Sequence, residues 1–576
     1  MGDAKHPLPA RVKRAALEMT ELVGAAVENT LAYNPLLGAR RRDTLDAAVA
    51  MARAIAASPK SSGQRLAECL RELQQVAAGK SDLAPDPKDR RFTDAAWRSH
   101  PYFRRLLQAH LATRKSLAAA IEESGIDPRN KSRAQFFAGL WADAVAPSNW
   151  LAGNPGAIRR AFDTGGLSLV RGMKHLVHDL RHNDGLPSQV DRAPFEVGVN
   201  IATTPGQVVL RTEMFELIQY APSTPRVHAR PLLMAPPQVN KFYCIDLTPQ
   251  KSLAKWAVDS GVQFFVISWR NPQVQHGRWG LDDYVAAIDA AVEATRRITG
   301  SRDVNMWGSC SGGMTLAAYL GWLAAKGLHK VANVTWAVCI LDTRDALEGG
   351  ALGMFNTPAA IRAAQARSRR RGLVRGPEMA ALFAWLRPND LIWNYWVNNY
   401  LMGNDPPAHD ILAWNSDTTN LPGRFHCDLL GLIEHNPYAN PGTLAVAGEA
   451  IDLSKVKIGA YVVAGSSDHI TPWRGCYRTA RMFGPKTEFV LANAGHLQCL
   501  INPPGGSGSW FFSGRAARAD ADAWQAGARR EEGSWWPHWR EWIQRHSLAL
   551  VPAPGRLGSR KYKPLAAAPG TYVMER

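Results

Sequence analysis

The pattern of apolar and polar positions changes near residue 205, and the change divides the chain into two parts of different predicted fold. Before this point, apolar residues recur at helical spacing with few β-branched residues, as in 44–57 and 104–123. Proline- and glycine-bearing breaks at 83–88 and 147–156 separate the helical stretches. The sequence therefore predicts a mostly helical N-terminal domain over residues 1–200.

Beyond residue 205, short apolar runs alternate with amphipathic stretches. The runs are 231–235, 263–268, 302–307, 334–341, 459–465 and 488–492, and helical candidates such as 281–297 and 313–326 lie between them. Short buried strands that alternate with helices are typical of a mostly parallel sheet covered on both faces. We therefore predict an α/β catalytic domain over residues 201–576.

More than a hundred residues between the runs at 341 and 459 contain no convincing strand and are rich in Trp, Asn, Pro and Arg. Such a length is too great for a loop in a compact domain, so we predict an inserted helical subdomain at about 344–450. Its tryptophans, among them Trp393, Trp396 and Trp414, suit packing of the insertion, a dimer contact or the lining of a channel. Ordinary core packing explains each of them equally well.

The composition of the chain is strongly basic. The 576 residues carry a formal net charge of +18, which often accompanies an anionic partner. No zinc finger, aromatic RNA-binding motif or basic zipper is visible, so nucleic acid is not a predicted partner. The basic clusters at 40–42 and at Arg367 and 369–371 fit solvated helix faces. They also fit contacts to the phosphates of a nucleotide-bearing substrate such as coenzyme A.

The cysteines indicate a reducing compartment. There are seven of them, scattered and without a C-x-x-C pair, which argues against a disulfide framework or a structural zinc site. The N-terminus lacks the apolar core of a signal peptide, and no run of 18 apolar residues would span a membrane. We expect a cytoplasmic protein with no transmembrane segment, no metal and no cofactor.

The stretch GSCSGG at 308–313 carries the most specific chemistry. It has the spacing of G-x-S-x-G, the sharp strand-to-helix turn that presents the serine nucleophile of many hydrolases, but Cys310 stands at the nucleophile position. A strand candidate precedes the turn and a helix candidate follows it. A thiol at a helix N-terminus is in a place that favours negative charge. The alternative, a chance turn of small residues, lacks this context.

Two further residues fit a catalytic triad in the chain order nucleophile, acid, histidine. Asp468 follows the run at 459–465, and His496 follows the run at 488–492. The alternative for His496 is a structural histidine without a catalytic role. We expect His469, beside the acid, to have a packing or supporting role.

The oxyanion hole of this kind of site uses the N–H after the nucleophile and one from a loop after an early strand. These groups are predicted to be the N–H of Ser311 and the N–H of Gln238 or Val239, in the loop 235–243. The alternative is that this loop is only a proline-rich turn.

A thiol nucleophile suits transfer of an acyl group from a thioester. The attack forms a second thioester of similar energy, so the acyl group remains activated and can pass to an alcohol. A serine would form an oxygen ester and lose that activation. Cysteine therefore favours acyl transfer over ester hydrolysis, although some hydrolases of this fold also use cysteine.

Motifs along nearly the whole chain identify a family. They are FTDAAWRSHPYF (92–103), PPQVNKFYCIDL (236–247), ISWRNP (267–272), GSCSGG (308–313), RPNDLIWNYWVNNYL (387–401), AGSSDHITPW (464–473), NAGHLQCLINPPG (493–505) and EGSWWPHW (532–539). The chain resembles the polyhydroxyalkanoate synthases, most closely the single-subunit type II group that favours medium-chain substrates. Ser309 and Ser311 flank the cysteine where that group has alanine.

The resemblance implies an α/β-hydrolase fold with a helical cap, which matches the insertion at 344–450. It implies that (R)-3-hydroxyacyl-coenzyme A is polymerised to a polyester with release of coenzyme A. Cys310 falls on the acyl-carrying nucleophile, His496 on the base and Asp468 on the triad aspartate. His496, or Asp468 with it, would activate the 3-hydroxyl group. The resemblance also implies a homodimer and association of the helical domain with polyester granules.

Two other functions share parts of this pattern. A thioesterase or polyester depolymerase on the same fold would have the same triad, but the long N-terminal domain and the thiol favour the synthase. A granule-coating or regulatory protein with a decayed site would not need Cys310, Asp468 and His496 in this order. The acyl chain length cannot be predicted, because it depends on which cap residues line the cleft.

Overall fold

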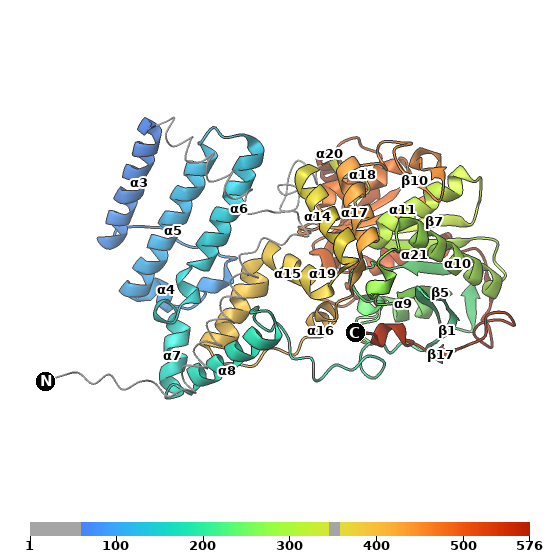
Figure 1. The fold of residues 1–576 in the computed structure, drawn as a ribbon, viewed down its shortest axis with the longest axis horizontal. Coiled ribbons are helices and arrows are strands. Elements are labelled where there is room, and N and C mark those ends of the chain that lie inside the picture. Colours follow the sequence, from blue (N-terminus) through green and yellow to red (C-terminus); the bar gives the residue numbers. More distant parts are fainter. Residues whose placement is uncertain (1–58, 345–357) are drawn as a thin grey trace. The chain divides into compact units, whose positions relative to one another are not determined.

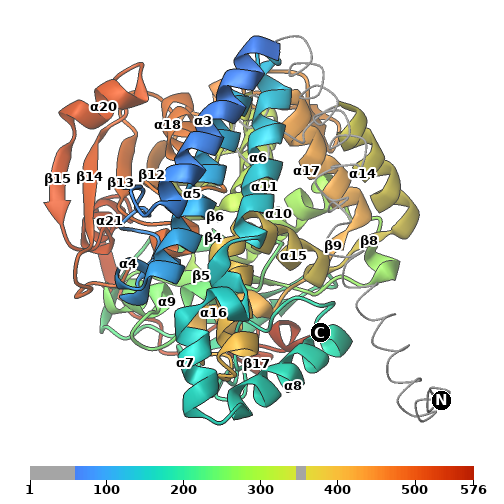
Figure 2. The same cartoon turned by 90° about the vertical axis from the view of Figure 1, so that its left-hand side faces the viewer.

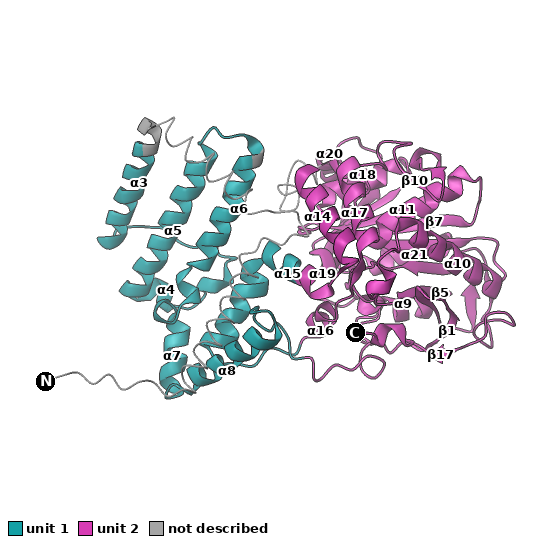
Figure 3. Cartoon of the chain, viewed as in Figure 1, with its two compact units in different colours: residues 1–191, 381–408 teal, residues 192–380, 409–576 magenta. Residues whose placement is uncertain are grey.

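The computed structural model describes residues 59–344 and 358–576, which form two compact units (Figures 1 and 3). Among the described residues, the first unit comprises 59–191 and 381–408, and the second comprises 192–344, 358–380 and 409–576. The helix predicted at 44–57 and the basic cluster at 40–42 lie outside the described residues. The domain boundary at 200 and the extent of the insertion stay predictions.

The first unit is helical, as the hydrophobic pattern predicts. Its main helices are α3 (Pro59–Ala77), α4 (Ala96–Ser99), α5 (Pro101–Glu122), α6 (Pro128–Ala144), α7 (Pro155–Asp163) and α8 (Leu167–His182). Helices α5, α6 and α7 each begin at a proline, which has no N–H to leave unsatisfied at a helix start. The side chains of Asp127 and Asn154 cap α6 and α7 by accepting the backbone N–H of Asn130 and Ala157.

Residues 381–408 are distant in sequence from the rest of this unit and belong to it through hydrogen bonds and aromatic packing. They include the end of α15 (Gly376–Leu386) and two π-helical turns, Asn389–Trp393 and Trp396–Leu401. The hydroxyl of Tyr400 donates to Asp179 at 2.8 Å, and the indole N–H of Trp396 donates to the carbonyl of Asn149 at 3.0 Å. Trp393 packs edge-on against Trp396. These two tryptophans therefore pack within the helical unit.

The second unit is built on a sheet of eleven strands among the described residues, in the order β15-β14-β13-β12-β7-β6-β4-β5-β2-β1-β17. Figure 2 shows β15, β14, β13 and β12 side by side. The strands are β1 (Gly206–Arg211), β2 (Phe215–Tyr220), β4 (Leu232–Ala235), β5 (Phe264–Trp269), β6 (Val304–Ser309), β7 (Val331–Ala337), β12 (Gly459–Gly465), β13 (Glu488–Ala492), β14 (Trp510–Arg515), β15 (Arg529–Glu532) and β17 (Ala566–Ala567). Short strands outside this sheet are β3 (Arg226–His228), β8 (Leu373–Val374), β9 (Leu421–Pro422), β10 (Ala445–Val446), β11 (Glu449–Ala450) and β16 (Leu550–Pro552).

The six central strands, β13 to β5 in the sheet order, are parallel. They coincide with the six apolar runs of the sequence, although β7 ends at Ala337 and not at 341. Antiparallel strands extend the sheet at both edges, and the hydrophobic pattern did not predict them. The predicted α/β architecture is confirmed.

Helices surround this sheet and fill the inserted segment where it is described (Figure 1). They are α9 (Leu253–Asp259), α10 (Leu281–Thr299), α11 (Cys310–Ala325), α14 (Pro358–Arg371), α16 (Asp410–Ser416), α17 (Gly423–His435), α18 (Trp473–Met482), α19 (His496–Leu500), α20 (Ala521–Gly527) and α21 (Trp536–Arg545). Arg367 and Arg371 of α14 pair with Glu378, so they stabilise the insertion locally. Their role toward substrate phosphates stays a prediction.

Alternate residues of the central strands face one large buried cluster, as the two-residue period of a strand requires. Leu232 and Met234 of β4, together with Trp307 of β6, contribute to it, and α9 and α21 pack on the same side. Trp307 and Trp539 are both fully buried and meet edge to face with ring centroids 5.1 Å apart. Trp414 is also buried, and its indole N–H donates to the carbonyl of Lys241 at 2.8 Å. Core packing thus accounts for these indoles.

No helix among the described residues is both long enough and apolar enough to cross a membrane.

Candidate active site

The candidate nucleophile lies at the junction of β6 and α11. Ser309 is the last residue of the strand, and Cys310 is the first residue of the helix, with a positive φ of 47°. A residue other than glycine rarely adopts this conformation, and such strain is typical of a nucleophile turn. Cys310 is partly exposed, whereas Cys244, Cys339, Cys427, Cys476 and Cys499 are buried. The turn therefore presents this thiol to solvent.

Glycines allow the turn to approach its neighbours closely. A Cβ added to Gly312 would lie 2.5 Å from the carbonyl oxygens of both Ala235 and Pro236, at the end of β4. A Cβ added to Gly308 would lie 2.8 Å from the Cα of Gly313. The glycines are therefore required because the helix begins in direct contact with the loop that follows β4.

Gly312→Ala tests this contact. Two backbone carbonyls cannot move aside as a side chain could, so we expect the free energy of unfolding to fall by about 1–3 kcal/mol. We also expect enzymatic turnover to fall, because the displaced loop lies beside Cys310. Gly431→Ala in α17 is the matched control, since a Cβ there meets nothing within 4 Å and the helix gains propensity. Equal unfolding free energies for both variants, measured in urea, would contradict the close contact.

The structure brings the two other predicted triad residues together. Asp468 follows β12 and His496 follows β13, and the two strands are parallel neighbours in the sheet. The Nδ1 of His496 lies 2.6 Å from the Oδ2 of Asp468. Cys310 interacts with His496 as well, because its thiol contributes to the raised pKa of the imidazole. Cys310, His496 and Asp468 thus form one connected chain of side chains.

The charges in this chain of side chains support each other. Burial lowers the pKa of His496, but the charge and hydrogen bond of Asp468, together with Cys310, outweigh burial and raise this pKa to about 10. Burial raises the pKa of Asp468, but the charge and hydrogen bond of His496 and the bonds from Thr471 hold it below its usual value. His496 is therefore suited to accept and hold a proton from the thiol.

These pKa shifts predict how stability depends on pH. The raised pKa of His496 contributes stability that is complete below its ordinary value of 6.5 and is lost as the pH rises through about 10. The lowered pKa of Asp468 contributes stability above its ordinary value of 3.8, which is lost as the pH falls through the lowered value. The loss of unfolding free energy in His496→Gln should therefore be largest from pH 4 to 6.5. A loss that grows toward pH 10 in urea titrations would contradict the ion pair.

Thr471 is a residue of the site that sequence reasoning missed. Its hydroxyl donates to Asp468 Oδ2 at 2.6 Å, and its backbone N–H donates to Oδ1 at 3.0 Å. The N–H of Ile470 donates to Oδ1 at 2.8 Å. The carboxylate therefore has a fixed orientation, and the spacing D-x-x-T was the only sequence signal for it. His469 is half-buried beside Asp468, and its packing or supporting role stays a prediction.

The predicted oxyanion donors lie on the two sides of the turn. Ser311 stands in the first turn of α11, where helix N–H groups have no partner within the helix. The N–H of Gln238 donates to the hydroxyl of Ser311 at 3.3 Å. Of the two loop candidates, the N–H of Gln238 thus already has an acceptor, which favours Val239 as the oxyanion donor.

The part of the chain that the structure describes contains no group of three or more His, Cys, Asp or Glu side chains placed to hold a metal ion.

Comparison with known proteins decides the family. The chain is 49% identical to poly(3-hydroxyalkanoate) polymerase 1 of Ectopseudomonas oleovorans, over 96% of this chain and 99% of that protein. The chain belongs to the poly(3-hydroxyalkanoate) polymerase family. Identity to polymerase 2 of the same organism is 48%, over 94% of this chain and 96% of that protein. The polymerase subunit PhaC of Cupriavidus necator is 38% identical, over 87% of this chain and 85% of that protein.

Two family models match successive parts of this polymerase. Residues 88–257 match the N-terminus of poly-beta-hydroxybutyrate polymerase (PhaC), and residues 237–503 match the alpha/beta hydrolase fold. The second match spans Cys310, Asp468 and His496. The predicted fold class and the resemblance to the type II group are confirmed, and the chain is an enzyme of polyhydroxyalkanoate synthesis.

Proposed function

We propose that this polymerase joins (R)-3-hydroxyacyl units from their coenzyme A thioesters into a polyester, through an acyl group carried on Cys310. The observation that carries the proposal is the connected set Cys310, His496 and Asp468 at a strained strand-to-helix turn. Membership of the polymerase family supports the product class. The proposed enzyme is an acyltransferase with a Cys-His-Asp triad.

The first proposed step transfers the acyl group to the enzyme. The Cys310 thiol gives its proton to His496, and the sulfur attacks the thioester carbonyl. The N–H groups of Ser311 and Val239 stabilise the oxyanion. The carbon–sulfur bond to coenzyme A breaks, and its thiolate takes the proton from His496. One acyl-Cys310 thioester and one free coenzyme A result.

The second proposed step extends the chain. The 3-hydroxyl group of one unit attacks the acyl thioester of another, and its proton passes to His496 with the assistance of Asp468. The sulfur–acyl bond breaks and an ester bond forms. Because the acyl group remained a thioester until this step, no further activation is needed. The reaction therefore requires no metal and no cofactor other than the coenzyme A of the substrate.

The test is to supply 3-hydroxydecanoyl-coenzyme A to the purified protein, with and without EDTA. We expect release of free thiol together with a high-molecular-weight polyester, at the same rate in both buffers. Release of thiol with free 3-hydroxydecanoic acid as the product would overturn the polymerase proposal and indicate a thioesterase. The family resemblance also supports a homodimer, which sedimentation velocity of the same preparation tests.

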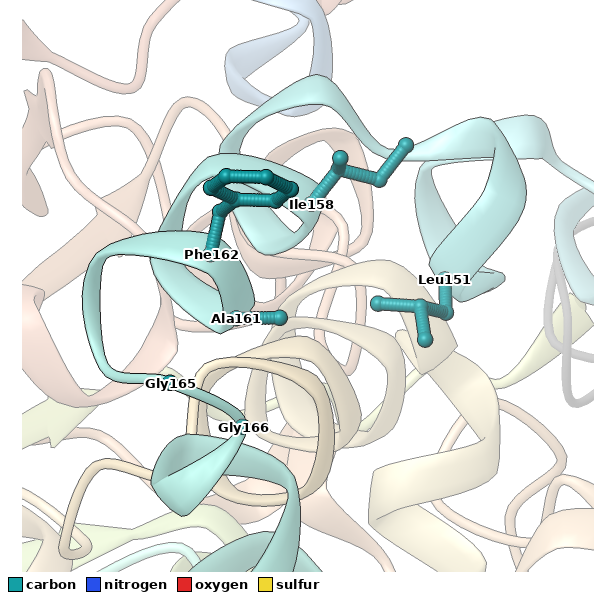
Figure 4. Close-up of a pocket in the computed structure, with 6 residues that line it drawn as sticks. All are labelled: Leu151, Ile158, Ala161, Phe162, Gly165 and Gly166. Atoms are coloured by element: carbon teal, nitrogen blue, oxygen red, sulfur yellow. The ribbon is translucent and has the colours of Figure 1, made fainter.

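We further propose that the helical unit contacts the surface of the polyester granule. Exposed apolar side chains gather on this unit: Trp150, Leu151, Phe162, Leu167, Val170 and Met173. Phe162 is 88% exposed. It borders an apolar pocket of about 440 Å³ with Leu151, Ile158 and the glycines of the α7–α8 turn (Figure 4). A water-insoluble product is a surface that such side chains suit.

The double substitution Phe162→Asp and Met173→Asp tests this surface. Both side chains are exposed, so we expect coenzyme A release from soluble substrate to remain within about twofold, since exposed substitutions seldom change stability by more than about 0.5 kcal/mol. We expect the fraction of protein that sediments with polyester granules to fall several-fold. Lys174→Asp on α8 is the polar control and should sediment normally. Undiminished sedimentation of the double variant would contradict the assigned surface.

A further inference from the structure

Three side chains hold Gln238, the residue that precedes the proposed oxyanion donor Val239. The N–H of Gln238 donates to the Ser311 hydroxyl, and its side-chain amide donates to the Thr315 hydroxyl at 3.1 Å. Its carbonyl accepts a hydrogen bond from the Thr419 hydroxyl at 3.0 Å. All four residues are buried. The backbone N–H, the side-chain N–H and the carbonyl of Gln238 are therefore each held by a hydrogen bond, and the bond to the carbonyl comes from a distant part of the chain.

The carbonyl of Gln238 and the N–H of Val239 belong to one peptide unit. This unit is planar, and in the trans form its C=O and N–H point in opposite directions. A hydrogen bond to the carbonyl consequently sets the direction of the N–H. A donor on the carbonyl also polarises the unit and strengthens the N–H as a donor.

We propose that Thr419 is a positioning residue of the oxyanion hole, which aims the Val239 N–H by holding the carbonyl of the same peptide unit. Thr419 does not touch the reacting atoms. It lies between α16 and α17, in the segment inserted between β7 and β12, so the insertion contributes to the geometry of the active site. An isolated bridge between Asn240 and Thr418 keeps the two segments in register. This inference rests on the proposed function, because it requires an acyl oxyanion at Val239.

The second half of the oxyanion hole is tied to the same network. The Thr315 hydroxyl donates to the carbonyl of Ser311 at 3.0 Å while it accepts the Gln238 side chain. The first turn of α11, which supplies the Ser311 N–H, is thus connected to the loop that supplies the Val239 N–H. The two donors are held at a fixed separation, which a preorganised oxyanion hole requires.

Thr419→Val tests the proposal, because valine keeps the shape of threonine and removes only the hydroxyl. We expect kcat for coenzyme A release to fall about tenfold with KM within twofold, a part of the 10²–10³-fold loss that follows removal of an oxyanion donor. Alkylation of Cys310 by iodoacetamide forms no oxyanion, so its rate should not change. Thr419→Ser should restore kcat. Thr295→Val on α10, where the hydroxyl bonds only the helix carbonyl of Ala291, is the matched control.

The results of these measurements separate the positioning role of Thr419 from the proposed function of the enzyme. Wild-type kcat in Thr419→Val would overturn the positioning role. Equal losses of coenzyme A release and of alkylation would also overturn it, since they indicate general disruption of the site. If the wild-type protein releases no coenzyme A, the proposed function fails first. The role of Thr419 is then tested by acylation of Cys310 with p-nitrophenyl hexanoate, which passes through the same kind of oxyanion. The rate of this acylation, relative to the rate of alkylation by iodoacetamide, should fall in Thr419→Val.

Discussion

Cys310→Ala should reduce coenzyme A release by about 10⁴-fold or more, because loss of the nucleophile from a triad removes covalent catalysis as a whole. The substitution deletes one sulfur from a partly exposed position at the surface of the turn. We therefore expect the urea midpoint of unfolding to be almost unchanged. Release of coenzyme A at more than one-tenth of the wild-type rate would show that another group is the nucleophile.

Cys310→Ser tests separately whether residue 310 can take the acyl group and whether that group must be held as a thioester for chain growth. The serine can take the acyl group as an oxygen ester, but the alkoxide is a poorer leaving group than a thiolate. We expect at most one equivalent of coenzyme A per site, released slowly, with no polymer in size-exclusion chromatography. Polymer formation at the wild-type rate would contradict the claim that thioester activation is needed for chain growth.

Asp468→Asn should lower kcat by about 10³–10⁴-fold while the fold is retained. In the wild-type protein both Thr471 and His496 donate to Oδ2. An amide N–H₂ at that position would oppose these two donors, whereas an amide oxygen there would leave the N–H₂ facing the backbone N–H groups of Ile470 and Thr471. Neither arrangement keeps the negative charge that holds a proton on His496.

Coenzyme A release measures this effect, and Thr471→Ser provides its control. Serine retains the hydroxyl that bonds Asp468, so we expect its kcat to stay within a few-fold of the wild-type value. A loss in Asp468→Asn of less than tenfold would contradict the role of the carboxylate as the partner of His496. A loss in Thr471→Ser as large as that in Asp468→Asn would show that position 471 acts through packing rather than through its hydroxyl.

The central part of the fold and the triad could be predicted because their signals are local. The six parallel strands are buried on both faces, so each reads as a continuous apolar run. The triad residues follow three of these runs, and parallel strands place their carboxyl ends at one edge of the sheet. The proximity of Asp468 and His496 therefore follows from topology alone.

The edge strands were not predicted because polar, charged or glycine residues leave only short or interrupted apolar runs in them. β15 consists of two arginines and two glutamates. β2 is fully buried but contains Glu216 and Gln219, whose polarity interrupts its run. Glu216 is satisfied by Arg211 and by residues 571 and 572, more than 350 positions along the chain. The bonds of Thr419 and of residues 381–408 are also long-range, so no local pattern indicates them.

The acyl-cysteine mechanism is tested most directly by locating the acyl group on the enzyme. The protein is mixed with 3-hydroxydecanoyl-coenzyme A, quenched in acid within the first turnovers, digested and analysed by mass spectrometry. We predict a 3-hydroxydecanoyl group on the peptide that contains Cys310, which neutral hydroxylamine removes as it removes thioesters. The label should be absent from Cys310→Ala. A label on any other residue, or one that persists in Cys310→Ala, would contradict the acyl-cysteine mechanism.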